Sequence, residues 1–125
     1  MPKTKGTREH WQEVPEEHDF AAAANYLSLT LPESTAAAIA EALRSATTIH
    51  RQAKDLLRAA RLELLPNTDP EVKKDLKKVA RGEKLSPVLL VRATPLLIAD
   101  GYHRICASYH LTEDAEIPCR LVDPS

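Results

Sequence analysis

At 125 residues the chain is long enough for one domain with a modest hydrophobic core. Its charged fraction of 28% and formal net charge of −1 exclude a uniformly basic nucleic-acid coat protein. The longest apolar runs, 88–91 and 95–99, are too short to span a bilayer, and no signal peptide is visible at the N-terminus. We therefore expect a cytoplasmic protein without a membrane partner, in which Cys106 and Cys119 are buried, reduced thiols.

The first 50 residues predict a helical segment that packs as a cover on the rest of the protein. Residues 1–8 predict a poorly ordered tail, and the acidic stretch after them predicts an irregular segment anchored by large side chains. Residues 21–29 favour a short helix, and Thr30 with Glu33 has the spacing of a capping box, which predicts a second helix ending near Ser45. The apolar residues that anchor this segment or share a helix face are Trp11, Val14, Phe20, Ala22, Tyr26, Leu29, Ala36, Ile39, Ala40 and Leu43.

The middle of the chain predicts one strand and two helices. Residues 47–50 have strand propensity, and we interpret His50 as a surface or edge-strand residue. A short helix is expected over 54–61, and Asp69 with Pro70 predicts the start of another helix that ends at Gly82. The apolar residues expected to face inward are Leu56, Leu57, Val72, Leu76, Val79 and Ala80. The cations on the other faces of the second helix are Lys73, Lys74, Lys77, Lys78 and Arg81.

The last part of the chain predicts a small sheet and one helix. Residues 88–91 form a continuous apolar strand that requires cover on both faces. The three residues after it are too few for a crossover helix, so 96–99 is expected to be its antiparallel hairpin partner. A helix to about residue 111 and a strand over 117–122 follow, which gives an α+β fold. The residues expected to be buried between the sheet and the helices are Leu89, Val91, Leu97, Ile105 and Leu121.

The turn at residues 100–104 carries the clearest chemical signal in the sequence. Gly101 can adopt the sharp strand-to-helix turn that a side chain opposes, and the helix start leaves N–H groups unpaired. Two basic residues, His103 and Arg104, occupy the first turn of that helix, where the helix dipole favours negative charge. An anion, most simply a phosphate, explains this placement. In the alternative, Arg104 pairs with Asp100 or an acidic loop residue such as Glu113 and only locks the turn.

Two further features near this turn are candidate parts of a binding site: Tyr102, and a stripe of potential metal ligands on the following helix. Tyr102 either stacks on a base or packs against the hairpin. His103, Cys106 and His110 share a helical stripe, but residues seven apart are separated by roughly 10 Å along the helix axis, too far for one zinc ion.

Four segments together resemble the N-terminal domain of ParB, within the ParB/sulfiredoxin superfamily, in order and spacing. They are Lys-Leu-Ser-Pro-Val-Leu-Leu-Val at 84–91, Ile-Ala-Asp-Gly-Tyr-His-Arg at 98–104, Ala107, and Ile-Pro-Cys-Arg-Leu-Val at 117–122. The resemblance covers roughly residues 52–122, residues 1–50 have no counterpart in it, and the length of the chain predicts a single domain over 1–125. A ParB/sulfiredoxin-like mixed sheet with packed helices would occupy 51–125, preceded by the helical segment 1–50.

The resemblance also implies a ligand. The matching turn contacts the triphosphate of CTP in ParB proteins and ATP in sulfiredoxin, and other relatives phosphorylate small molecules. Gly101, His103 and Arg104 would accordingly bind phosphate, and Asp100 would coordinate Mg or accept a proton. Lys74 and Lys78 are expected to point toward the same cleft, as residues of the helix before the first strand do in sulfiredoxin-like sites.

Two departures from the family pattern narrow the expected function. Tyr102 stands where sulfiredoxin has its catalytic cysteine, so sulfinic-acid reduction is not expected. ParB usually has two arginines where this chain has His103 and Arg104, and it continues into a helix-turn-helix, so a chromosome-partition clamp is not expected either. We expect a protein that binds a nucleotide (ATP, CTP or ADP, with or without Mg) or another phosphorylated small molecule. The alternatives are a nucleotide-dependent phosphotransferase or hydrolase, and a nucleic-acid or protein-interaction module that uses the basic helix 70–81.

Overall fold

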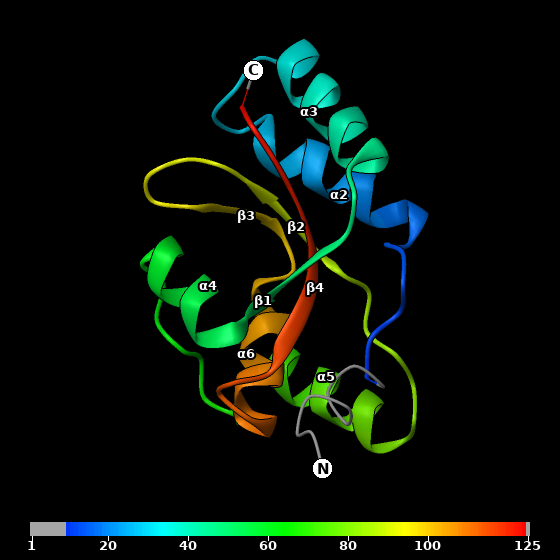
Figure 1. The fold of residues 1–125 in the computed structure, drawn as a ribbon, viewed down its shortest axis with the longest axis vertical. Coiled ribbons are helices and arrows are strands. Elements are labelled where there is room, and N and C mark those ends of the chain that lie inside the picture. Colours follow the sequence, from blue (N-terminus) through cyan, green and yellow to red (C-terminus); the bar gives the residue numbers. More distant parts are fainter. Residues whose placement is uncertain (1–9, 125) are drawn as a thin grey trace.

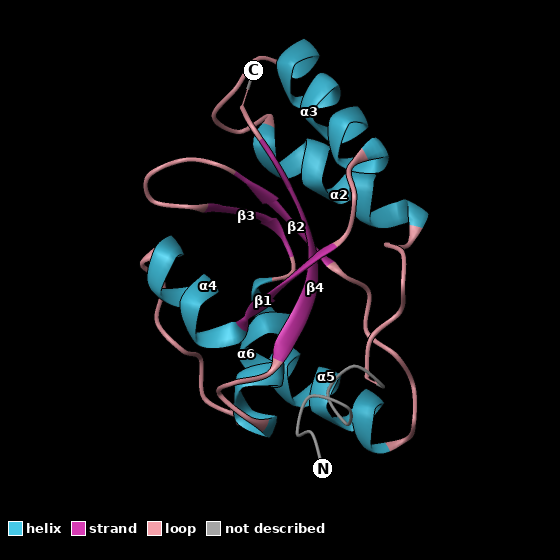
Figure 2. Ribbon diagram, in the orientation of Figure 1, coloured by secondary structure: helices cyan, strands magenta, loops and turns pink. Residues whose placement is uncertain are grey.

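The computed structural model describes residues 10–124, which form a four-stranded mixed sheet with helices packed on it (Figure 1; Figure 2). The predicted α+β class is therefore confirmed, and the predicted tail at 1–8 lies outside the described residues. The helices are α2 (Glu17–Leu27), α3 (Glu33–Ser45), α4 (Ala53–Ala60), α5 (Pro70–Ala80) and α6 (Tyr102–Leu111). The strands are β1 (Ile49–Gln52), β2 (Val88–Val91), β3 (Leu97–Asp100) and β4 (Glu116–Val122).

The sheet has the strand order β1-β4-β2-β3, so β2 lies in the interior and β1 and β3 form the edges. The predicted hairpin is confirmed, because β2 and β3 are antiparallel with Leu90 opposite Ile98. β4 runs parallel to β2, with Val88 opposite Cys119, and antiparallel to β1. His50 lies in β1, so its predicted place on an edge strand is confirmed.

The side chains of β2 divide the hydrophobic core into two clusters, one on each face of the sheet. Val88 and Leu90 belong to a cluster with α4, α5 and α6, while Leu89 and Val91 belong to a second cluster with α2 and α3. Figure 1 shows α2 and α3 on one side of the sheet and α4, α5 and α6 on the other. Successive residues of a strand face opposite sides, so a strand with no polar side chain needs cover on both. The N-terminal helices supply that cover on one face.

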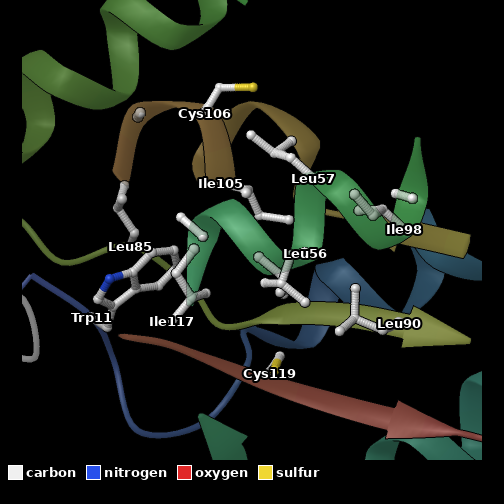
Figure 3. Close-up of a cluster of buried hydrophobic side chains, with 14 of the residues drawn as sticks. Trp11, Leu56, Leu57, Leu85, Leu90, Ile98, Ile105, Cys106, Ile117 and Cys119 are labelled. Atoms are coloured by element: carbon white, nitrogen blue, oxygen red, sulfur yellow. The ribbon is translucent and has the colours of Figure 1, made fainter. Parts of the chain in front are cut away.

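The first cluster contains Trp11 as well as residues from the helices and strands, as Figure 3 shows. The backbone of the segment around Trp11 pairs with Leu85 through two hydrogen bonds, of which the N–H of Gln12 donates to the Leu85 carbonyl at 2.8 Å. Cys106 and Cys119 are buried in this cluster as free thiols, as predicted. Burial raises the pKa of the Cys119 thiol to about 11, which keeps it protonated and unreactive at neutral pH.

The N-terminal helices differ from the prediction in where they begin and in which face they bury. α2 starts at Glu17, so Phe20 belongs to the helix rather than to an irregular segment. Its buried face is Asp19, Phe20, Ala23 and Leu27, whereas the predicted residues Ala22, Tyr26 and Leu29 are exposed, as is Val14. This register buries a phenylalanine and a leucine and leaves the amphipathic tyrosine in water, which removes more apolar surface from solvent.

The predicted capping box before α3 is wrong. The N-cap residue is Pro32, which makes no side-chain hydrogen bond. Thr30 instead lies in a turn, and its backbone N–H donates to the Leu27 carbonyl. Pro32 disfavours helical backbone at Leu31, so the helix begins only after the proline, and Leu31 packs against the second cluster. By contrast, the Asp69 cap of α5 is confirmed, because its carboxylate accepts from the N–H groups of Glu71 and Val72.

Five of the residues expected to face inward in the middle and last parts of the chain are less buried than predicted. Leu76, Val79, Leu97 and Leu121 are half-buried, and Ala80 is exposed at the end of α5. Leu97 lies on the edge strand β3, where one flank of the strand has no neighbour. Leu89, Val91 and Ile105 are fully buried as predicted, and so are the inner residues of α3.

Replacement of Leu89 by Ala should therefore test the second cluster more sharply than replacement of the half-buried Leu97. A fully buried leucine truncated to alanine costs about 2–5 kcal/mol of unfolding free energy, so the midpoint of urea denaturation should fall clearly. Leu29→Ala is the control, because its side chain is exposed and its loss should change stability by less than about 0.5 kcal/mol. Equal effects of the two substitutions would contradict the packing of α2 and α3 on β2.

Candidate anion site

The turn between β3 and α6 is built around Gly101, for two separate reasons. Its φ of +115° lies in the left-handed region that side chains oppose. In addition, a Cβ at this position would lie 2.5 Å from Cγ1 of Val88, so β2 passes directly against the turn. Gly101 is the N-cap of α6 and provides no side-chain cap, so the first-turn N–H groups are left for another acceptor.

A polar cleft of about 210 Å³ opens beside this turn, between α5 and the start of α6. The two helices pack against each other at one end of the molecule (Figure 1). Six of the seven predicted site residues line this cleft: Lys74, Lys78, Asp100, Gly101, His103 and Arg104. The structure thus brings the basic residues of α5 and of α6 to one place.

Carboxylates line the same cleft and limit its positive charge. Glu71 and Asp75 of α5 lie among its walls together with Asp100. Burial raises the pKa of Asp75, against the opposing influence of Arg104 and Lys78. The cleft is therefore a mixed-charge site, lined by both cations and carboxylates.

Arg104 is held by internal contacts on one side of its guanidinium. Nη2 donates to Oδ2 of Asp100 at 2.9 Å, lies 3.4 Å from the Pro87 carbonyl oxygen, and approaches Oδ2 of Asp19 at 3.6 Å. Arg104 thus forms the ion pair with Asp100 that the alternative interpretation of the turn predicts. Among residues 10–124, the buried Nε has no hydrogen-bond partner. The side chain keeps 17% of its surface exposed and lines the cleft.

Asp19 is a member of this site that the sequence analysis missed. It lies on the inner face of α2 with only 3% of its surface exposed, and Oδ2 accepts a hydrogen bond from the Ser86 hydroxyl. Ser86 in turn accepts from the N–H of Glu16 at 3.0 Å, which fixes the start of α2 against the beginning of β2. A helix starting at Glu17 places Asp19 one turn before the buried Ala23, and a carboxylate on that apolar face was the available signal.

Asp100 faces the guanidinium of Arg104. Burial raises its pKa, Arg104 lowers it, and the nearby Asp19 raises it further, so the carboxyl keeps its proton to a higher pH than a free aspartate. The described residues contain no group of three His, Cys, Asp or Glu side chains that could hold a metal ion. The residues present do not fit the expected magnesium site, because the cationic group beside Asp100 is Arg104.

Two residues of the helical stripe on α6, Cys106 and His110, contact the segment before α5, while His103 lines the polar cleft. The backbone N–H of Leu65 donates to Sγ of Cys106 at 3.5 Å, and Nε2 of His110 lies 2.7 Å from the Leu65 carbonyl oxygen. The stripe therefore fixes the segment between α4 and α5 against α6.

Tyr102 lies on the other side of the turn from the polar cleft. Its ring packs against the first cluster, and its hydroxyl donates to the Glu63 carbonyl at 2.6 Å. It also lines a larger, mainly apolar groove of about 600 Å³ between α2, α4 and β3. Asp100, Gly101 and His103 line both the groove and the polar cleft, so the two cavities meet at the turn.

Comparisons with known proteins identify no relative of this chain. No family model, no curated protein and no solved structure matches it. The structure by itself defines a class, a small α+β domain with a glycine-centred strand-to-helix turn at one end of a mixed sheet. Within residues 10–124, no helix is long and apolar enough to cross a membrane.

Proposed function

We propose that this protein binds a nucleotide or another phosphorylated small molecule, with its phosphate in the polar cleft at the start of α6. The observation that carries the proposal is the convergence of Lys74 and Lys78 with His103 and Arg104 beside an uncapped helix N-terminus. Backbone N–H groups, the helix dipole and nearby cations are what a phosphate requires. The resemblance of residues 84–122 to the ParB/sulfiredoxin superfamily supports the same ligand class.

The neighbouring groove supports a nucleotide over inorganic phosphate. Because the two cavities share Asp100, Gly101 and His103, a ligand with its phosphate in the polar cleft can place an apolar or aromatic body in the groove. Tyr102 and Leu96 contribute apolar surface to that groove. Binding is the proposed function, and a proton-accepting role of Asp100 remains a prediction.

Calorimetric titration of the purified protein tests this proposal. ATP, CTP, ADP and inorganic phosphate are titrated separately, each with and without Mg²⁺, and the mixtures are then analysed for products. We expect saturable binding of at least one nucleotide, tighter than that of phosphate. A protein that binds none of the four would overturn the proposal, and appearance of a hydrolysed or transferred phosphate would establish an enzyme.

The paired substitution Lys74→Ala and Lys78→Ala should weaken nucleotide binding. Each exposed or half-exposed ammonium contributes about 0.5–1 kcal/mol to an ionic contact, which predicts a loss of roughly five- to thirtyfold. The matched control is Lys73→Ala with Lys77→Ala, which removes the same charge from the same helix outside the polar cleft. If the two double variants behave alike, or if both stay within twofold of the parent, the cleft residues of α5 have no part in binding.

A second candidate function is supported by one observation on the outer face of α5. A shallow groove of about 310 Å³ is lined by Pro70, Lys73, Lys74, Lys77 and Arg81, without an acidic residue among them. Such a surface suits the phosphate backbone of a single-stranded nucleic acid. In that case an oligonucleotide should bind with a steep salt dependence, and the Lys73 and Lys77 double variant should reduce the slope of log affinity against log salt by about 1.4.

A further inference from the structure

The contacts of Arg104 connect the N-terminal helix α2 to the proposed anion site. Two carboxylate oxygens, Oδ2 of Asp100 and Oδ2 of Asp19, lie within 3.6 Å of the same nitrogen, Nη2 of Arg104. One guanidinium therefore faces two carboxylates, one from β3 and one from α2. An anion that binds Arg104 must therefore compete with the carboxylates of Asp19 and Asp100.

The two carboxylates hold Arg104 unequally. Asp100 makes the shorter contact, at 2.9 Å, and the Pro87 carbonyl oxygen at 3.4 Å is the next acceptor of Nη2. Asp19 is more distant from Nη2. Its Oδ2 is already engaged by the Ser86 hydroxyl, and its Oδ1 lies 3.3 Å from Nε2 of the exposed His18. Its main effect on the site is therefore its charge rather than the orientation of Arg104.

We propose that Asp19 restrains anion binding: its buried carboxylate competes with the incoming phosphate for Arg104, so the N-terminal helix sets the affinity of the site. The inference rests on the proposed phosphate-binding function. Asp19 acts through Arg104 and not through contact with the ligand. Removing its charge while keeping its shape should strengthen anion binding, which is the opposite of what damage to the fold would do.

The experiment compares sulfate binding by the parent protein and by Asp19→Asn, followed through backbone amide NMR shifts of the turn. Sulfate serves as the probe because its charge is constant near neutral pH. Asparagine can still accept the hydrogen bond from Ser86. We expect Asp19→Asn to bind sulfate about three- to tenfold more tightly, as removal of one unit charge a few ångströms from an ion pair predicts once salt screening is included.

Two controls separate charge at the site from other effects. Asp123→Asn removes the same charge from an exposed ion pair with Arg92, at the opposite end of β2 from the turn, and should leave sulfate affinity unchanged. Leu27→Ala weakens the packing of α2 without a change of charge, and should lower stability but not tighten binding. If Asp19→Asn does not fold, Asp19→Ser provides a second uncharged residue that can bond Ser86.

The outcomes distinguish the inference from the proposed function. Sulfate binding by the parent with unchanged or weaker binding by Asp19→Asn overturns the inference and leaves the proposed function standing. No sulfate or nucleotide binding by either protein overturns both. Tighter binding by Asp19→Asn, with Asp123→Asn equal to the parent, supports the inference.

Discussion

Replacement of Arg104 by Ala should weaken nucleotide binding roughly 10- to 150-fold. A charge-assisted contact between a guanidinium and phosphate oxygens is worth about 1.5–3 kcal/mol, and this is the amount that the substitution removes. Arg104 is suited to this contact because its Nη2 is anchored by Asp100 while its side chain lines the cleft. Calorimetric titration of the parent and the variant with the same nucleotide measures the loss directly.

The same substitution should also lower the stability of the fold. From the sequence alone, the ligand is the expected partner of the guanidinium, and a change of stability is not expected. In the structure, Arg104→Ala leaves the buried Asp19 and the half-buried Asp100 without their cation, which costs about 1–3 kcal/mol. Melting curves of both proteins, recorded beside the titrations, show whether the variant is folded at the temperature at which binding is measured.

Arg104→Lys separates the role in binding from the role in stability. Lysine restores a positive charge near Asp19 and Asp100 but cannot bind phosphate in a forked geometry, so it should recover most of the stability and only part of the affinity. Full recovery of both stability and nucleotide affinity would show that a positive charge at this position is sufficient, without the forked geometry of arginine. A large loss of stability in Arg104→Ala, with nucleotide affinity unchanged, would mean that Arg104 only locks the turn.

Replacement of Gly101 by Ala should destabilise the protein by about 2–5 kcal/mol, because left-handed backbone and overpacking each add to the cost. The added Cβ would lie 2.5 Å from Cγ1 and 2.8 Å from Cβ of Val88, and neither atom can move far because Val88 is fully buried in β2. The midpoint of chemical denaturation measures this change. Loss of anion binding should accompany it, since the turn fixes the first N–H groups of α6.

Gly82 offers a matched control for this substitution. Its φ of +83° is also left-handed, but a Cβ there would meet nothing within 4 Å. Gly82→Ala should therefore show the backbone cost alone, about 1–2 kcal/mol. Equal destabilisation by the two substitutions would mean that the close approach of Val88 to the turn contributes nothing.

Several parts of the fold were predictable because they depend on residues close together in the sequence. Asp69 caps α5 through the N–H groups of its own first turn, and Gly82 adopts the left-handed conformation after that helix. The short connection 92–96 forces an antiparallel hairpin. The continuous apolar run of β2 requires cover on both faces, whichever elements supply it. In these cases the residues that determine the local structure lie within a few positions of it in the sequence.

The burial of individual residues depended on the order of the strands. Leu97 is half-buried because β3 is an edge strand, and the sequence contains no local signal of that order. The capping pattern at Thr30 failed for a different, local reason. Pro32 disfavours helical backbone at Leu31, the residue that would follow the cap, so α3 begins only after the proline.

The candidate site shows the same division between sequence and tertiary structure. Residues 100–104 indicate an anion-compatible turn by themselves, because the glycine, the helix start and the two basic residues are consecutive. That Asp19 of α2 meets Arg104, with Ser86 between α2 and β2 holding it in place, was decided only by the packing of α2 on the sheet. A contact between side chains so distant in the sequence has no local signature, because the free energy that forms it comes from burying whole helix faces, not from the residues beside it.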